Sequence, residues 1–517
     1  MHGRDRSGGP EHRFDTGTFM ERPVYLGELR TDRSGRLIFL GGHGVSASVA
    51  DKPADTFANN DGWYDDISDG PVTAEVRIDG RPIPVEPAWV VTGPPNYAPE
   101  LVSVRTMYDL VHDAFVTAGA LPEPQQVSFT HDVLPVLRRL CDLQWVNQGV
   151  AVQLGHGGRE DLLAPDRLAA LADPSPVRRE LRRQVWLTIR NYDRDGFSPV
   201  PWPVVYGDAM NVPAASVRQH VTLSPLQYRL MQRWARGDFV ADFDPQAVPP
   251  ASLDKVPFAQ RPETLDRAAL SFCLADAFHP GCELTWPMRH TTLYSRPFRV
   301  RHRDPHLPPP SYGPRLTPQI ALAYDGPLYA QRPGDLTRWM AVPWQTDTAS
   351  CRSGYEYLSG FGIYDPYLPT FWPARVPNHV MAEEEYAVVM DTSRPIAERL
   401  AAFENRRVWL RWLPPRYLDA INAMVTDFGK LGLVERRPGP TDDPRLPAEV
   451  LVESEVSFPL EPAPPARRNL VAVHVPLGAE PLLGEAAMAT AVTMAELPDE
   501  EVSAGFIDKV KRFRRDR

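Results

Sequence analysis

The sequence predicts an α+β fold, in which a β-rich N-terminal part packs on a helical body that carries a long, irregular, aromatic-rich segment. Short β-rich runs fill the first hundred residues, and apolar residues at helical spacing follow them. Residues 278–380 show no clear periodicity. Such a pattern is typical of segregated α and β elements. We expect four regions: a disordered 1–22, a β-rich domain 23–102, a mainly helical and loop domain 103–460, and a tail 461–517.

The N-terminal strands are predicted from β-branched and aromatic runs that are bounded by Gly, Asp-Gly and Pro. Together they indicate an antiparallel sheet region, because the connections between them are short. The runs are Val24–Leu29, Arg36–Leu40, Thr73–Ile78 and Trp89–Thr92.

The helices are predicted from apolar residues that recur every three to four positions. Ser175-Pro176 is a typical helix start for the third of them. The expected helices are Val104–Ala118, Val133–Val146, Arg178–Ile189, Leu226–Arg236, Leu265–Ala277, Ile396–Trp409 and Pro415–Leu431. In the tail we expect a Pro-rich stretch, Glu461–Pro465, a short strand, Asn469–His474, and a basic end.

Composition narrows the class of protein. The chain has 517 residues, of which 56 are proline, about twice the usual share of roughly 5%, so rigid loops should be frequent. A net charge of −10 gives no general attraction to nucleic acid or anionic lipid. No apolar run is long enough to span a bilayer, and Met1–Pro10 lacks the apolar core of a signal peptide. We therefore expect no nucleic-acid or membrane partner, and a cytoplasmic location or export without a conventional signal.

Three other patterns suggest familiar sites, and we interpret each as structural. Gly42–Ala47 matches a dinucleotide fingerprint, but no helix follows it. The acidic cluster of Asp61, Asp65, Asp66 and Asp69 lacks the spacing of a calcium loop, so we expect a turn network around Asn60, Gly62 and Gly70. Cys273, His279 and Cys282 offer only three zinc ligands. We expect no metal.

The irregular segment contains an unusual group of reactive residues. Asp347 precedes Cys351 by four positions, and Trp372 follows Cys351 by 21 positions in a turn braced by prolines. Four cysteines are too few for a disulfide scaffold in a chain of this length, so each thiol is interpreted singly. From the residues alone, a buried thiol in an aromatic-lined core is the simplest interpretation.

The segment Leu336–Cys351, with its Trp-Gln-x-Asp-x-x-x-Cys block, resembles the LodA-like family, the lysine ε-oxidases and glycine oxidases that use cysteine tryptophylquinone. Further matches span roughly residues 23–380. They are Arg36–Gly42, Phe57–Val72, Ala88–Val91, Pro94–Pro99, Phe278–Gly281 with Trp286, and Pro297–Arg299.

The resemblance implies a cofactor formed by this chain itself. Cys351 and Trp372 would be joined by a thioether, and the indole would be oxidised to a quinone, cysteine tryptophylquinone. The expected activity is oxidative deamination of a primary amine of an amino acid or a derivative, releasing ammonia and hydrogen peroxide. The resemblance also implies a FAD-dependent maturation protein as a partner, and a homo-oligomer is possible.

The resemblance assigns roles to further residues. Asp347 would act in building the cofactor, and we add it as a candidate general base. His379, in an Arg-Val-Pro-Asn-His stretch closer to the glycine-oxidase branch, is a candidate for the catalytic pocket. Cys282, Trp344 and Phe371 are weaker candidates for the pocket lining.

Two departures from the family leave other functions open. The resemblance begins near Pro23, so we expect a short N-terminus, and the connection from Cys351 to Trp372 is shorter than in lysine oxidases. The substrate could then be larger than a free amino acid. One alternative is a non-catalytic binding or scaffold protein with unmodified Cys351 and Trp372. Another is a quinone-containing dehydrogenase that uses an acceptor other than oxygen.

Overall fold

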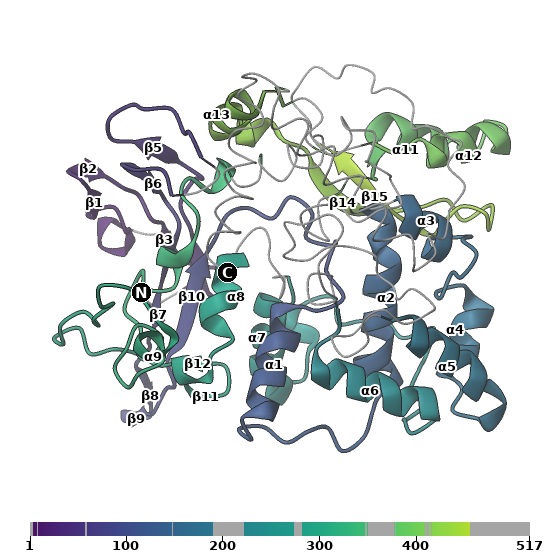
Figure 1. Cartoon of the computed structure of the whole chain (residues 1–517), viewed down its shortest axis with the longest axis horizontal. Coiled ribbons are helices and arrows are strands. Elements are labelled where there is room, and N and C mark those ends of the chain that lie inside the picture. The colour runs from purple at the N-terminus through teal and green to yellow at the C-terminus, as the bar shows by residue number, and fades with distance from the viewer. Residues whose placement is uncertain are drawn as a thin grey trace. The chain divides into compact units, whose positions relative to one another are not determined.

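The computed structural model describes residues 4–7, 9–56, 59–146, 148–189, 222–272, 282–346, 349, 377, 379–407, 409, 413–414 and 416–454 (Figure 1). The chain forms two compact units, each assembled from separate stretches. Unit 1 comprises Met1–Pro95, Ala114–Leu121 and Pro280–Asp347. Unit 2 comprises Asn96–Asp113, Pro122–His279 and Thr348–Arg517. The boundaries that we expected at residues 22, 102 and 460 stay a prediction.

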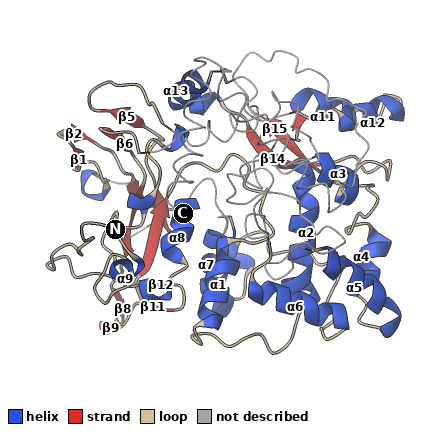
Figure 2. Cartoon of the chain, in the orientation of Figure 1, coloured by secondary structure: helices blue, strands red, loops and turns tan. Residues whose placement is uncertain are grey.

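The α+β class is confirmed. Figure 2 shows that strands predominate in unit 1, whereas unit 2 consists mostly of helices. Among the described residues no helix has the length and apolarity to cross a membrane.

Unit 1 contains small antiparallel strand pairs: β1 with β2, β3 with β4, β5 with β6, β7 with β10, β8 with β9, and β11 with β12. The strands are β1 Thr18–Phe19, β2 Arg22–Pro23, β3 Glu28–Thr31, β4 Leu37–Leu40, β5 Ser46–Ser48, β6 Trp63–Asp65, β7 Ser68–Val72, β8 Val76–Ile78, β9 Arg81–Ile83, β10 Ala88–Thr92, β11 Tyr294–Arg296 and β12 Arg299–Val300. Its helices and helical turns are η1 Pro10–His12, α8 Cys282–Met288, η8 Thr291–Leu293, α9 Pro318–Ala321 and η9 Thr337–Trp339.

The start of the chain differs from the expectation of disorder. β1 and β2 pair as a short hairpin, and the Phe14 amide donates to the carbonyl of Gly27 at 2.9 Å. Gly27 has φ of 132°, and a Cβ there would lie 2.1 Å from the carbonyl oxygen of Leu40. Only glycine fits such a backbone contact. For this reason the strand predicted from Val24 begins after Gly27.

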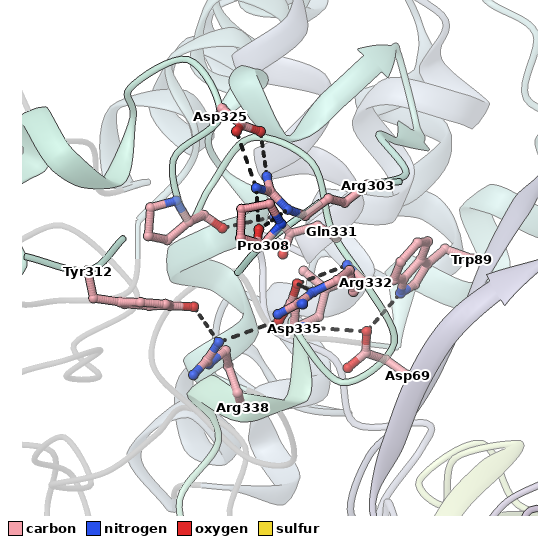
Figure 3. A network of polar contacts seen from close by, with 12 residues as sticks. Asp69, Trp89, Arg303, Pro308, Tyr312, Asp325, Gln331, Arg332, Asp335 and Arg338 are labelled. Carbon is pink, nitrogen blue, oxygen red and sulfur yellow. Dashed lines mark hydrogen bonds and ion pairs between the residues drawn. The ribbon is translucent and has the colours of Figure 1, made fainter. Parts of the chain in front are cut away.

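Buried polar contacts order the loops of unit 1 between residues 301 and 338 (Figure 3). The Arg303 guanidinium donates to the carbonyl of Pro308 at 2.7 Å and to Asp325 at 2.5 Å. The Asp69 carboxylate accepts hydrogen bonds from the indole of Trp89 at 3.0 Å and from the amide of Thr337 at 2.7 Å. Residues that lack periodicity in the sequence are therefore ordered by side chains far away along the chain.

Unit 2 is built mainly from helices, together with the three-stranded sheet β13-β15-β14. The elements are α1 Met107–Thr117 (whose last residues belong to unit 1), η2 Phe129–Val133, α2 Leu134–Asp142, η3 Leu143–Trp145, α3 Gln148–Leu154, α4 Pro165–Ala172, η4 Pro176–Arg178, α5 Arg179–Thr188, α6 Pro225–Arg236, η6 Leu253–Lys255, η7 Phe258–Gln260, α7 Arg261–Ser271, β13 Met381–Ala382, α11 Glu383–Met390, α12 Ile396–Glu404, α13 Tyr417–Asp427, η10 Phe428–Lys430, β14 Leu433–Pro438 and β15 Glu449–Ser454.

Helix α6 shows why the local sequence forms a helix at that place. Ser224 and Gln227 form a reciprocal capping box at its start, and Gly237, with φ of 91°, ends it. Its apolar face includes the fully buried Trp234, whose indole donates to the carbonyl of Leu171 at 3.0 Å. Burial of one such aromatic side chain stabilises a fold by roughly 2–3 kcal/mol.

The predicted helices are present, with ends shifted by a few residues. The largest shift within the described residues is in Ile396–Trp409, where α12 ends at Glu404. For Leu265–Ala277, α7 is Arg261–Ser271, and residues 273–277 lie outside the described part. The predicted Val133–Val146 is divided into η2, α2 and η3. The expected strand Asn469–His474 and Glu461–Pro465 lie outside the described residues.

Candidate functional site

The described part of unit 1 ends in a buried segment, residues 340–346, that leads directly into Asp347. The Val342–Pro343 peptide bond is cis, and Trp344–Thr346 form a helical turn. Trp344 is 2% exposed, and Gln345 is fully buried. Deeply buried residues at this place fix the point from which the chain continues toward Cys351.

Asn60 holds the beginning of this segment. Its side-chain amide donates to the carbonyl of Val342 at 3.1 Å, and its backbone amide donates to the same oxygen at 3.0 Å. The side-chain oxygen Oδ1 of Asn60 accepts hydrogen bonds from the backbone amides of Asp55 at 2.9 Å and Thr56 at 3.2 Å. Asn60 is thus the centre of a turn, as the sequence indicated, and that turn also binds a segment 282 residues away.

Asp65 and Ser46, on the paired strands β6 and β5, hold the rest of the segment. Asp65 accepts a hydrogen bond from the Trp344 amide at 3.2 Å and another from the Ser46 hydroxyl. Ser46 Oγ also lies 2.8 Å from Gln345 Oε1, and Gln345 donates to the carbonyl of Gly44 at 3.1 Å. Both strands therefore contact the segment through side chains.

Burial raises the pKa of Asp65 to about 7, and the neighbouring Asp66 carboxylate adds to this increase. The hydrogen bonds from Ser46 and from the Trp344 amide act in the opposite direction. The protonated carboxyl is therefore favoured in the folded state below neutral pH.

We expect replacement of Asp65 by asparagine to change how stability depends on pH. Between pH 3.8 and about 7 the folded state binds a proton that the unfolded state does not, so stability falls as pH rises through this window. This increase in the pKa of Asp65 corresponds to a change of about 2–4 kcal/mol in the free energy of unfolding. Asp65→Asn mimics the protonated form and should have a higher melting temperature than wild type at pH 8, with little difference at pH 4. The exposed Asp61→Asn is the control, and equal pH slopes in Asp65→Asn and wild type would contradict the assignment.

The other patterns that suggested familiar sites have structural roles. Ser46–Ser48, at the end of the Gly-rich match, form a strand, so no helix presents its N-terminus to a phosphate. Asp66 accepts from the His43 amide at 2.6 Å, and Asp69 caps η9. No group of three or more potential metal-binding side chains occurs within the described ranges, a search that leaves out Cys273, His279 and Cys282.

In unit 2, the structure fixes His379 from two sides. Its backbone amide donates to the carbonyl of Trp145 at 3.0 Å, and Val380 forms a β-bridge with Arg407. Its ring Nδ1 lies 2.9 Å from the carbonyl oxygen of Gln144. Because a carbonyl oxygen only accepts, Nδ1 carries the proton, and Nε2 is left as a lone-pair acceptor.

The surroundings of His379 keep its ring neutral. Burial lowers the pKa of His379 to about 3, and the positive charge of Arg406 lowers it further, against the hydrogen bond to Gln144. A neutral imidazole with a defined tautomer can accept a hydrogen bond at neutral pH, whereas a pKa of about 3 makes it a weak base for proton transfer.

The remaining candidate residues are placed only in part. Asp347, Cys351, Phe371 and Trp372 lie outside the described residues, so their roles stay predictions. Cys282 begins α8, but its side chain also lies outside the described part. The buried Trp344 belongs to the segment that precedes Asp347.

Comparison with known proteins gives two family matches. Residues 2–92 match the L-lysine ε-oxidase N-terminal model, and residues 205–372 match the L-lysine ε-oxidase C-terminal domain. The chain belongs to the LodA-like family. The N-terminal match begins at residue 2, so our expectation that the resemblance starts near Pro23 was wrong. Residues 2–22 contain none of the motifs quoted above, but they lie within the region that the N-terminal family model matches.

One relative is named an L-lysine 6-oxidase. The LodA-like chain is 28% identical over 363 residues to the L-lysine 6-oxidase of Marinomonas mediterranea, covering 63% of this chain and 46% of that protein. It thus spans about half the length of this relative. Two structures of the L-lysine ε-oxidase from the same organism match with a TM-score of 0.55 and 20% identity. They cover 86% and 87% of this chain, and 69% and 71% of theirs, and they show the shared fold.

Sequence reasoning missed several residues that hold these segments of the LodA-like chain in place. Asn60 and Gln345 stood inside the recognised blocks, but nothing local showed that they contact Val342 and Ser46. Arg406 was missed entirely. Sequence reasoning placed it inside the predicted helix Ile396–Trp409, where charged residues are usually exposed.

Proposed function

We propose that this chain is a quinoprotein oxidase that deaminates a primary amine of an amino acid or of an amino-acid derivative. The balanced reaction converts the amine, one oxygen molecule and one water molecule into a carbonyl compound, ammonia and hydrogen peroxide. The amine-bearing carbon is oxidised by two electrons, and oxygen accepts them. The proposal extends from the family to this chain, which spans only part of the curated relative.

One observation carries the proposal. The match to the L-lysine ε-oxidase C-terminal domain covers residues 205–372, so it includes Asp347 and Cys351 and ends at Trp372. The residues that the resemblance assigns to cysteine tryptophylquinone therefore lie inside the shared family region. The relative that is named an L-lysine 6-oxidase supports an amino-acid amine as the substrate class.

The described residues that precede Asp347 suit a cofactor made from Cys351 and Trp372. Bound in the chain, the quinone would supply an electrophilic carbonyl for the amine and would accept two electrons. On the N-terminal side, Asn60 and Asp65 fix residues 342–344, and thereby the start of the turn that precedes Asp347. Such rigid support from neighbouring residues is what a reactive group requires for accurate placement.

We assign proton transfer and substrate binding to side chains near the two cofactor residues. Asp347 is our candidate base for the proton on the amine-bearing carbon, and it also acts in cofactor formation. His379, seven residues after Trp372, has at Nε2 an acceptor without a partner among the described residues, which can accept a hydrogen bond from the substrate. Its low pKa keeps this acceptor available throughout the neutral range.

We expect peptide mass spectrometry to detect the crosslink. Protein co-expressed with a FAD-dependent maturation protein should give a Cys351–Trp372 crosslinked peptide that carries two added oxygens. Protein expressed alone should give unmodified peptides, because no part of this sequence indicates a flavin site that could install the oxygens. The buried Cys141 is the internal control and should remain a free thiol in both samples.

Each alternative function has its own result. Co-expressed protein with both residues unmodified would favour the scaffold interpretation. A crosslinked protein that oxidises amines without forming peroxide would be a dehydrogenase with another electron acceptor. Full modification without any partner would contradict the assignment of a maturation protein.

A further inference from the structure

Arg406, in unit 2, is a buried cation: burial lowers its pKa to about 9, and the negative charge of Glu404 acts in the opposite direction. The residue is 9% exposed, and its Nη1 has no hydrogen-bond partner. Within the described part of the chain no carboxylate forms an ion pair with it. Its guanidinium carbon lies 4.1 Å from the centre of the Trp145 ring and 4.2 Å from that of Phe403. Aromatic faces offset only part of the cost of burying a charge.

Two acidic side chains of unit 2 form ion pairs with other arginines, although Oε2 of Glu385 has no hydrogen-bond partner among the described residues. Glu385 accepts hydrogen bonds from Asn405 at 2.8 Å and from Arg407. Arg399, another buried arginine of unit 2, binds both oxygens of Asp442 at 2.6 and 2.8 Å. Among the described residues, Arg399 thus has an ion-pair partner, whereas Arg406 has none. An unpaired buried guanidinium is the state that a carboxylate ligand would complete.

A second group that can bind a ligand lies on the same side of the backbone. The antiparallel bridge between Val380 and Arg407 makes His379 and Arg406 diagonal neighbours on one face. The ring of His379 donates through Nδ1 to Gln144, and Nε2 has no hydrogen-bond partner within the described ranges. A cationic donor and a neutral acceptor therefore lie next to each other, beside the indole of Trp145.

We propose that Arg406 is the binding residue for a carboxylate group of the ligand, with Nε2 of His379 as an acceptor for a donor group of the same ligand. The guanidinium fork suits the two oxygens of a carboxylate, and Trp145 and Phe403 hold the fork in place. This inference rests on the proposed function in naming an amino acid as the source of the carboxylate. The carboxylate site itself can be tested without any turnover.

Acetate is the direct probe, because it has the carboxylate but no amine that could react. Titration calorimetry of the full-length protein should show acetate binding that weakens roughly tenfold or more in Arg406→Met, as expected for loss of a charge-assisted hydrogen bond. Arg406→Lys, which keeps the charge but not the fork, should bind with intermediate affinity. Arg394→Gln removes an exposed arginine of the same unit and should bind acetate as wild type does.

Thermal stability separates a ligand-binding arginine from a structural one. Arg399→Met should lower the melting temperature clearly, because it removes a buried guanidinium that pairs with Asp442 and donates to the buried carbonyl of Val389. Arg406→Met removes a charge that has no partner and should leave the melting temperature unchanged or raise it. A decrease as large as that in Arg399→Met would assign Arg406 a structural role and overturn the proposal.

The two proposals fail in different ways. Acetate affinity that is equal in wild type and Arg406→Met, or a wild type that binds no acetate, would overturn the carboxylate site even if amines are oxidised. Arg406-dependent acetate binding in a protein that never forms peroxide would support the carboxylate site and overturn only the oxidase proposal.

Discussion

Replacement of Cys351 by serine is expected to abolish amine oxidation and the crosslink together. A serine hydroxyl cannot form the thioether with Trp372, so the electrophilic carbonyl would be absent and no ordinary side chain could replace it. Peroxide formation should fall to the uncatalysed level, a loss of roughly a million-fold or more. Peroxide release with glycine and L-lysine as trial substrates, together with the intact mass of each variant, measures the effect.

The matching variants test each half of the proposed cofactor. Trp372→Phe should give the same loss, because a phenyl ring lacks the electron-rich indole that takes up the two oxygens. Cys141→Ala removes another thiol, 1% exposed on α2, and should keep peroxide formation, with only a modest loss of stability. Peroxide formation in Cys351→Ser at the wild-type rate would exclude a cofactor that contains this thiol.

Replacement of Asn60 by alanine has the second largest expected effect. The change removes side-chain hydrogen bonds to Asp55, Thr56 and Val342, and it leaves the part-buried backbone amides of Asp55 and Thr56 without these partners. We expect a loss of about 2–4 kcal/mol in the free energy of unfolding. The yield of crosslinked protein should also fall, because residues 342–346 would lose the contact that fixes the chain before Asp347. Chemical denaturation and peptide mass spectrometry measure the two effects.

Two further variants make this test specific. Asn60→Asp keeps an acceptor for the amides of Asp55 and Thr56, but it turns an oxygen toward the carbonyls of Thr56 and Val342. It should therefore reduce crosslinking as strongly as the alanine variant. Asp61→Ala alters the next, exposed residue and should behave as wild type. Normal crosslinking in Asn60→Ala would show that this turn does not position the segment.

Local pattern gave good predictions for the elements of unit 2 and poorer ones for the loops of unit 1. α6 was predicted almost to its ends, because its capping box, apolar face and terminal glycine lie within one short stretch. The loops between 301 and 338 showed no period, because their order comes from the buried contacts of Arg303 and Asp69 with distant residues. Such contacts leave no trace in local periodicity.

The sequence by itself determined the family, the α+β class and the candidate chemistry, since these depend on residue types at fixed spacings such as those of Asp347, Cys351 and Trp372. Only the tertiary structure showed that Asn60 holds a segment 282 residues away, and that Ser46 contacts Gln345 across 299 residues. Only the tertiary structure, likewise, showed that Arg406 is buried against Trp145 with no ion-pair partner among the described residues. The physical reason is that burial and pairing depend on which surfaces meet in the folded chain, and one local stretch of sequence does not contain that information.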